Sequence, residues 1–211
     1  MSAIYLFFLS LPFAPSLEPH LPALQVVIPL LAAPVCVLLR DAKLSWLWAL
    51  IVTWVSFAIA LVLLGKTLST GLIIYEMGNW PAPWGIEYRI DAANAVVLVI
   101  VTAIASVTLP YAKASIEREV PRARIYLFYL MYMLCMTGLL GITTTADAFN
   151  LFVFLEISSL SSYVLISLGQ NRRALTASYC YLIMGTQGAT FYIIGVGMMY
   201  MMTGTLNMAD L

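Results

Sequence analysis

Residues 44–64 read LSWLWALIVTWVSFAIALVLL, an unbroken apolar segment without a charged side chain. A helix needs roughly 20 mostly apolar residues to cross the hydrocarbon core of a bilayer, so this segment predicts a transmembrane helix. Five further segments meet the same criterion. The predicted spans are residues 23–40, 44–64, 92–113, 124–143, 148–168 and 176–203.

The composition of the whole chain agrees with this prediction. Of the 211 residues, 63% are hydrophobic and 9% are charged, against roughly 45–50% and about 25% in soluble domains. Ten Lys and Arg residues balance ten Asp and Glu residues, so no basic excess indicates nucleic acid as a partner. The lipid bilayer is the partner that the composition implies. The predicted fold class is all-α, a polytopic integral membrane protein of about six transmembrane helices.

The predicted spans divide the chain into an N-terminal extension, residues 1–22, and a transmembrane helical domain, residues 23–211. The extension contains an apolar stretch from Ala3 to Phe13, which is too short to cross a bilayer. The longest polar connection, residues 66–91, contains the sequence GNWPAPWG at residues 78–85. Its Gly and Pro residues are typical of a turn.

Cysteine and histidine usage excludes several kinds of site. Cys36, Cys135 and Cys180 are odd in number, far apart and surrounded by apolar residues, which fits neither a disulfide framework nor a CxxC pair. His20 is the only histidine, so a histidine metal site or a Ser-His-Asp triad has too few residues. No metal and no cofactor are expected.

Basic residues are distributed unevenly among the loops. Eight of the ten fall in the first, third and fifth connections between spans, namely Arg40, Lys43, Lys113, Arg118, Arg122, Arg124, Arg172 and Arg173. Lys66 and Arg89 lie in a connection on the other side. Because short cytoplasmic loops accumulate Lys and Arg, both termini are predicted on the non-cytoplasmic side of the cell (inner) membrane.

Glu156 is the one acidic residue predicted at membrane depth, because the other nine lie in loops or at span ends. It lies about 12 Å from the start of the span 148–168 at 1.5 Å per residue, near the middle of a core about 30 Å thick. An unpaired charge there costs around 2.5–3.5 kcal/mol. We therefore expect Glu156 to face the bundle interior and to handle a proton. The alternative is a protonated carboxyl that bonds to a serine and joins two helices.

Three further polar residues are candidates for a pathway or for helix contacts. Ser159 and Tyr163 follow Glu156 at i+3 and i+7 and share its helix face. Their hydroxyls would extend a chain of waters, although serines in membrane helices more often serve close packing. Gln187, in the sixth span, either bonds to a neighbouring helix or lines a wet path. The same span carries glycines that are typical of close helix contact, namely Gly185, Gly188 and Gly195.

Four sequence blocks carry a resemblance to a known family. They are DAFNLFVFLE (147–156), SYVL (162–165), GTQGATFY (185–192) and TGTLNM (203–208). They resemble the antiporter-like subunit family, which includes the D subunits of Mrp-type multisubunit monovalent cation/proton antiporters. The family also includes the proton-pumping membrane subunits of respiratory complex I and relatives in energy-converting hydrogenases. The turn at residues 78–85, followed by Asp91, is most similar to the Mrp branch.

The resemblance covers roughly residues 23–211 and implies a role for Glu156. Family members have about fourteen helices with two inverted five-helix repeats, and a glutamate in the fifth helix pairs with a lysine on the broken seventh helix. Glu156 falls on the position of that glutamate. The lysine and the known residues of helices seven, eight and twelve have no counterpart in this sequence. The resemblance therefore predicts a fragment, a split subunit or a chain completed by another one, without transport on its own.

Together these observations predict proton and monovalent cation (Na+/H+) translocation within a larger complex, with Glu156 as the intramembrane proton-handling carboxylate. Other membrane subunits, protons and Na+ are the expected partners. No catalytic chemistry of its own is expected, although the resemblance includes subunits of complex I-like and hydrogenase ion-translocating oxidoreductases. Two alternatives stay open. One is a non-transporting assembly or docking subunit of a complex I-like oxidoreductase, and the other is a membrane enzyme that acts on lipid or quinone.

Overall fold

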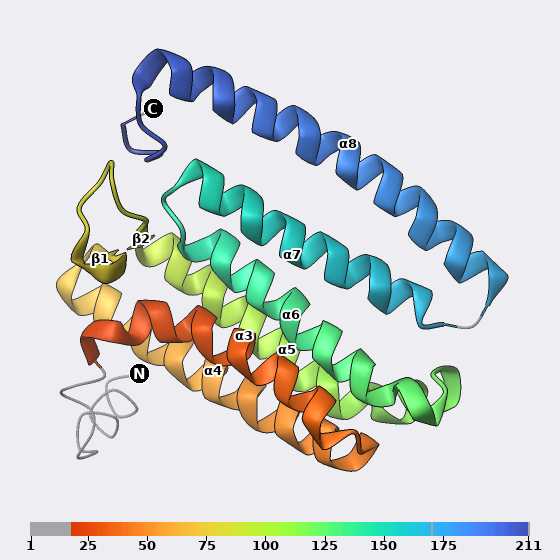
Figure 1. Cartoon of the computed structure of the whole chain (residues 1–211). Helices are drawn as coiled ribbons and strands as arrows, with labels where there is room; N and C mark the ends of the chain where they lie inside the picture. Colours follow the sequence, from red (N-terminus) through yellow and green to blue (C-terminus); the bar gives the residue numbers. More distant parts are fainter. Residues whose placement is uncertain (1–17, 170, 211) are drawn as a thin grey trace.

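The structure is a computed structural model that describes residues 18–169 and 171–210. This part of the chain contains six helices that are long and apolar enough to cross a membrane, as Figure 1 shows. They are α3 (Leu21–Leu39), α4 (Ala42–Thr70), α5 (Ala92–Glu119), α6 (Ile125–Thr144), α7 (Ala148–Ser167) and α8 (Arg172–Thr203). Short 3-10 helices are η1 (Glu18–His20), η2 (Met77–Asn79) and η3 (Arg122–Arg124). The prediction of an all-α membrane protein with six spans is confirmed.

Several helices extend beyond the apolar segments that predicted them, and their caps explain the bounds. The side chains of Asp41, Asp91 and Asn171 accept hydrogen bonds from backbone N–H groups in the first turns of α4, α5 and α8. Such caps satisfy donors that have no partner within the helix. At its far end α4 is capped by Gly71, whose φ of 85° is readily adopted only by glycine. Helix ends therefore follow backbone capping rather than the limits of the apolar core.

The start of the described part is attached to the helices. In η1 the Glu18 carboxylate lies 3.3 Å from the Nζ atom of Lys66 at the end of α4. The apolar stretch from Ala3 to Phe13 lies outside the described residues. The division between an extension and a helical domain after residue 22 stays a prediction.

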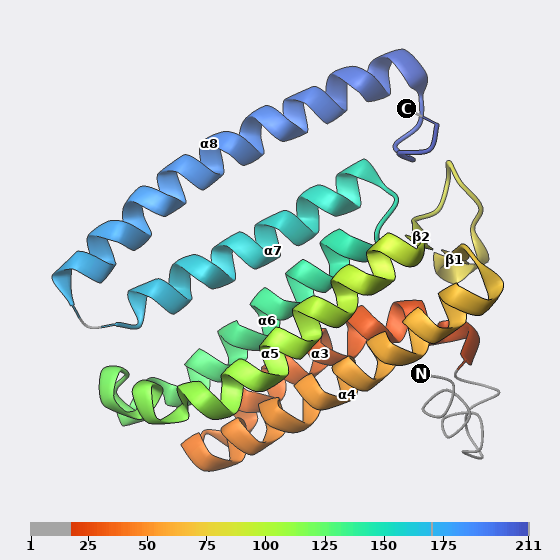
Figure 2. The same ribbon diagram turned by 180° about the vertical axis from the view of Figure 1, so that it is seen from behind.

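The first four long helices form a bundle, and the last two extend from it one after the other. Helices α3, α4, α5 and α6 form a four-helix bundle, α7 packs on α6, and α8 packs on α7, as Figures 1 and 2 show. The buried apolar side chains lie mostly inside the bundle, with Leu63, Leu98 and Leu140 among the completely buried ones. Helix α8 has few neighbours in the described part of the chain because only α7 lies along it.

A β-hairpin fixes the end of the bundle from which α7 begins. Strand β1 (Ile73–Glu76) pairs antiparallel with β2 (Glu87–Ile90), and the predicted turn connects them. Two isolated bridges continue the pairing, from Tyr88 to Thr145 and from Asp147 to Asn207. The loop before α7 and the loop after α8 are thus tied to the hairpin, which sets the position of both helices at this end.

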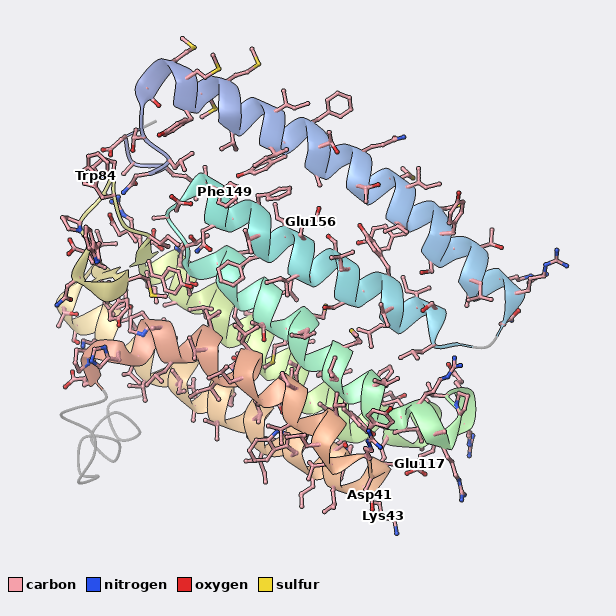
Figure 3. The ribbon with its side chains drawn as sticks, viewed as in Figure 1. Asp41, Lys43, Trp84, Glu117, Phe149 and Glu156 are labelled. Carbon is pink, nitrogen blue, oxygen red and sulfur yellow. The ribbon has the colours of Figure 1, made fainter. Side chains whose placement is uncertain are left out.

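The connections between the helices divide into two groups. The loops α3–α4, α5–α6 and α7–α8 lie at one end of the molecule. Figure 3 shows Asp41, Lys43 and Glu117 at this end and Trp84 at the opposite one. The basic loops are therefore grouped as the sequence predicts. Which side of the membrane they occupy stays a prediction.

Candidate functional site

Glu156 lies in the middle of α7, and its side chain is directed toward α8 (Figure 3). The side chain is half-buried and borders a groove of about 280 Å³ between the two helices. Phe152, Leu155 and Ser159 line the groove from α7. Four α8 residues form the other wall, namely Gly185, Gly188, Ala189 and Tyr192. The groove therefore places one carboxylate in an otherwise largely apolar space.

Small residues on α8 keep the groove open. A Cβ atom built at Gly188 would meet no atom within 4 Å among the described residues. Gly185 differs, because a Cβ atom there would collide with the hydroxyl oxygen of Tyr163. Helix α8 thus approaches α7 closely at Gly185 and leaves space beside Glu156.

Aromatic pairs join α7 to α8 on both sides of Glu156. Toward the hairpin, Phe152 stacks on Tyr192 with ring centroids 6.4 Å apart and an interplanar angle of 6°. Toward the α7–α8 loop, Tyr163 meets Tyr181 edge to face at 4.8 Å. The Tyr192 hydroxyl also donates to the Ala148 carbonyl at 3.2 Å. These contacts fix the spacing of the two helices and hence the width of the groove.

The carboxylate of Glu156 has no hydrogen-bond partner and no cation within the described residues, where the one ion pair joins Glu18 and Lys66. The described residues also bring together no group of three His, Cys, Asp or Glu side chains. Glu156 therefore acts as a single carboxylate.

The structure separates the residues that the sequence suggests for a pathway. Ser159 lines the groove with Glu156, and it has no hydrogen-bond partner among the described residues. Tyr163 is buried two turns further along α7, with its hydroxyl against Gly185. Gln187 lies on an exposed face of α8 and does not line the groove. Only Ser159 is therefore placed beside the carboxylate.

The remaining serines of α7 serve packing or bond to their own helix. The hydroxyl of Ser162 lies 3.4 Å from the sulfur of Cys135 on α6, and that of Ser161 donates to the Ile157 carbonyl. These side chains lie on other faces of α7, away from the Glu156 groove. The expectation that most of these serines serve packing agrees with these contacts.

Comparisons with known proteins agree with the sequence blocks. Residues 145–211 match the family model NADH:quinone oxidoreductase/Mrp antiporter, TM. The chain is 43% identical to NADH-quinone oxidoreductase subunit N of Desulforudis audaxviator over 195 residues, which are 91% of this chain and 38% of that protein. It is 37% identical to the D subunit of the Na(+)/H(+) antiporter of Alkalihalophilus pseudofirmus over 141 residues, 67% of this chain and 28% of that protein. The chain belongs to the antiporter-like subunit family.

A solved structure extends the family assignment to the fold. The membrane-bound sulfane sulfur reductase, an archaeal respiratory membrane complex, contains a chain that superimposes with a TM-score of 0.83 at 30% sequence identity. The match covers 89% of this chain and 38% of that one. The chain thus spans less than two fifths of the proteins it matches. Two of the family branches named from the sequence, the Mrp antiporters and complex I, are represented among its relatives.

In this antiporter-like chain, sequence reasoning missed two α8 residues of the groove. Tyr192 and Ala189 share a helix face with Gly185, at i+7 and i+4. That spacing predicts that the three residues lie on one side of α8. Only the packing of α8 against α7 shows that this side lines the groove. Gly188 and Gly195 have no described atom within 4 Å of a built Cβ, so close helix contact at these two glycines stays a prediction.

Proposed function

We propose that this chain is part of a proton- and cation-translocating antiporter-like subunit, and that Glu156 is its proton-handling carboxylate. The observation that carries the proposal is the position of Glu156, half-buried at mid-helix in a groove without a cation among the described residues. The names of the relatives, one from an Na(+)/H(+) antiporter and one from an NADH-quinone oxidoreductase, support ion translocation in a multisubunit complex. Protons, with Na+ as the exchanged cation, are the proposed cargo.

The mechanism is electrostatic. An unpaired charge near the middle of the membrane is poorly solvated, so a bound proton or a nearby cation lowers the cost of placing a carboxylate there. A cation that approaches through the groove favours the ionised form and displaces the proton. Each unit charge moved across 100 mV is worth about 2.3 kcal/mol, so the exchange couples to the membrane potential. The small wall residues of α8 leave room for the approach.

Removal of the charge at constant size tests this proposal. In membrane vesicles that contain the complete host complex, Glu156→Gln should assemble normally and reduce proton-coupled cation transport at least about ten-fold. Glu156→Asp should retain part of the rate, because the charge is withdrawn by one methylene. Asp147 is unsuitable as a control, because its carboxylate caps α7 through the Asn150 amide at 2.6 Å. The matched control is Glu117→Gln. Glu117 is an exposed acid at the end of the molecule that carries the basic loops.

The second candidate function is a non-transporting docking subunit of a complex I-like oxidoreductase. It is favoured by the outer face of α8, where Phe191, Met201 and Met202 are 76–88% exposed. A docking surface on α8 does not require an ionisable side chain at position 156. If Glu156→Gln assembles and transports at the parental rate, the docking function replaces the transport function.

A further inference from the structure

A second groove lies on another side of α7, between α5 and α7. Figure 2 shows α5 and α7 on either side of α6, and α6 forms the floor. The deeper part is an apolar cavity of about 260 Å³. Its walls include Ile104 on α5 and Leu165 on α7, and Cys135 and Leu139 lie on its floor. We call this groove, with its continuation described next, the α5–α7 trough.

The trough continues from the apolar cavity to the basic end of the molecule. A cavity of about 390 Å³ shares Leu165 with the first one and reaches Glu119 and Asn171. A third hollow shares Asn171 and is lined by Arg172 and Arg173. The lining thus changes in one direction from apolar side chains to polar and charged ones. An amphipathic ligand, with an apolar tail at one end and a polar headgroup at the other, matches this order.

The length and the opening of the trough fit one leaflet of a bilayer. From Ile104 to Glu119 the rise along α5 is about 22 Å at 1.5 Å per residue. Half of a bilayer with its headgroups is about 20–22 Å thick. Ile104 and Val107 are 61% and 65% exposed on the outer side of α5, so the apolar part of the trough opens sideways toward lipid.

The charges at the polar end select the headgroup. Arg172 and Arg173 are exposed at the start of α8, and neither has an ion pair among the described residues. Glu119 is the one acid among the lining residues of these hollows. Two guanidinium groups and one carboxylate leave a net positive mouth, which favours an anionic phosphate group.

We propose that the α5–α7 trough binds one anionic phospholipid, with its phosphate at Arg172 and Arg173 and an acyl chain between Ile104 and Leu165. A lipid fits better than a protein segment, because the apolar end faces the bilayer and the charged end lies at its surface. The inference is independent of the role of Glu156.

The test uses the complete host complex reconstituted with a phosphatidylglycerol that carries a diazirine in its acyl chain. After photolysis, mass spectrometry should find label on peptides of α5 and α6 around Ile104 and Leu139. A phosphatidylcholine with the same diazirine should label these peptides much less. The double variant Arg172→Ala, Arg173→Ala should lower labelling by phosphatidylglycerol at least about ten-fold, whereas lysine at both positions should keep most of it.

Matched variants sharpen the test. Glu119→Gln removes the opposing charge and should raise labelling by phosphatidylglycerol. The double variant Arg40→Ala, Lys43→Ala removes two positive charges from the α3–α4 loop, which lies at the same end of the molecule. This variant should leave labelling unchanged. The amount of assembled complex is measured for every variant. Equal labelling by the two lipids, insensitive to Arg172 and Arg173, would mean ordinary boundary lipid, and no labelling would mean that protein covers the trough. Either result overturns the proposal.

Discussion

The two faces of α7 differ in how closely their neighbours approach. On the α6 side, a Cβ atom at Gly138 would lie 2.7 Å from the backbone nitrogen of Ser158, and one at Gly141 would enter the Phe154 ring. On the α8 side, Gly188 faces open space beside Glu156. Glycines therefore allow close packing at the α6–α7 interface, whereas Gly188 leaves open space at the α7–α8 interface. A glycine in a membrane helix indicates closeness only where the neighbouring backbone fills the space that its side chain leaves.

The largest stability effect is expected from filling the closed face. Gly138→Ala places a methyl group against backbone atoms of α7, which cannot move aside as a side chain can. We expect a loss of about 1–3 kcal/mol in the free energy of unfolding, as for other overpacked cores. Denaturant unfolding of the chain in detergent measures this loss.

The matched control for that experiment is Gly197→Ala on α8. Gly197 is exposed and has no described atom near its built Cβ. This substitution should leave stability unchanged or raise it by up to about 1 kcal/mol through helix propensity. Equal losses at the two positions would contradict the contrast between the faces of α7.

A smaller effect is expected at Gly185, the one glycine of α8 whose built Cβ meets α7. In Gly185→Ala the new methyl group collides with the Tyr163 hydroxyl, which is the far end of a side chain and can shift. We expect a loss of about 1 kcal/mol. Tyr163→Phe removes the obstructing oxygen, so Gly185→Ala should cost much less in that background. A double-mutant cycle by thermal unfolding measures the coupling, and strictly additive losses would show that the two residues do not interact.

The most local effect is expected where the loop after α8 meets the hairpin. The side-chain amide of Asn207 donates to the Glu87 carboxylate at 3.0 Å, and the Met208 amide donates to the Ala146 carbonyl at 2.8 Å. Asn207→Ala removes the first bond, worth about 1 kcal/mol. Hydrogen exchange of the Met208 amide should accelerate about five-fold. Glu76→Gln, at the exposed position opposite Glu87 in the hairpin, should leave it unchanged.

The sequence predicted the helices and the place of Glu156 along its helix, because both depend on local order along the chain. A long apolar run predicts a membrane-spanning helix whatever other helices pack around it. The rise of 1.5 Å per residue then gives the distance of Glu156 from the start of that helix. Helix ends were less accurate. α4 extends to Thr70, well beyond the apolar run that ends at residue 64, because backbone hydrogen bonds continue outside the membrane core.

Only the tertiary structure decided which helix faces meet. Gln187 and Gly185 are two residues apart, yet one is exposed and the other touches Tyr163, because the rotation of α8 is set by its packing on α7. The pairing of Asn207 with Glu87 joins the loop after α8 to strand β2, 120 residues away in the chain. Sequence by itself thus determined that a carboxylate lies in the middle of a long apolar helix. Packing decided that it lies in an open groove, since the space around a side chain depends on neighbours that are distant in the chain.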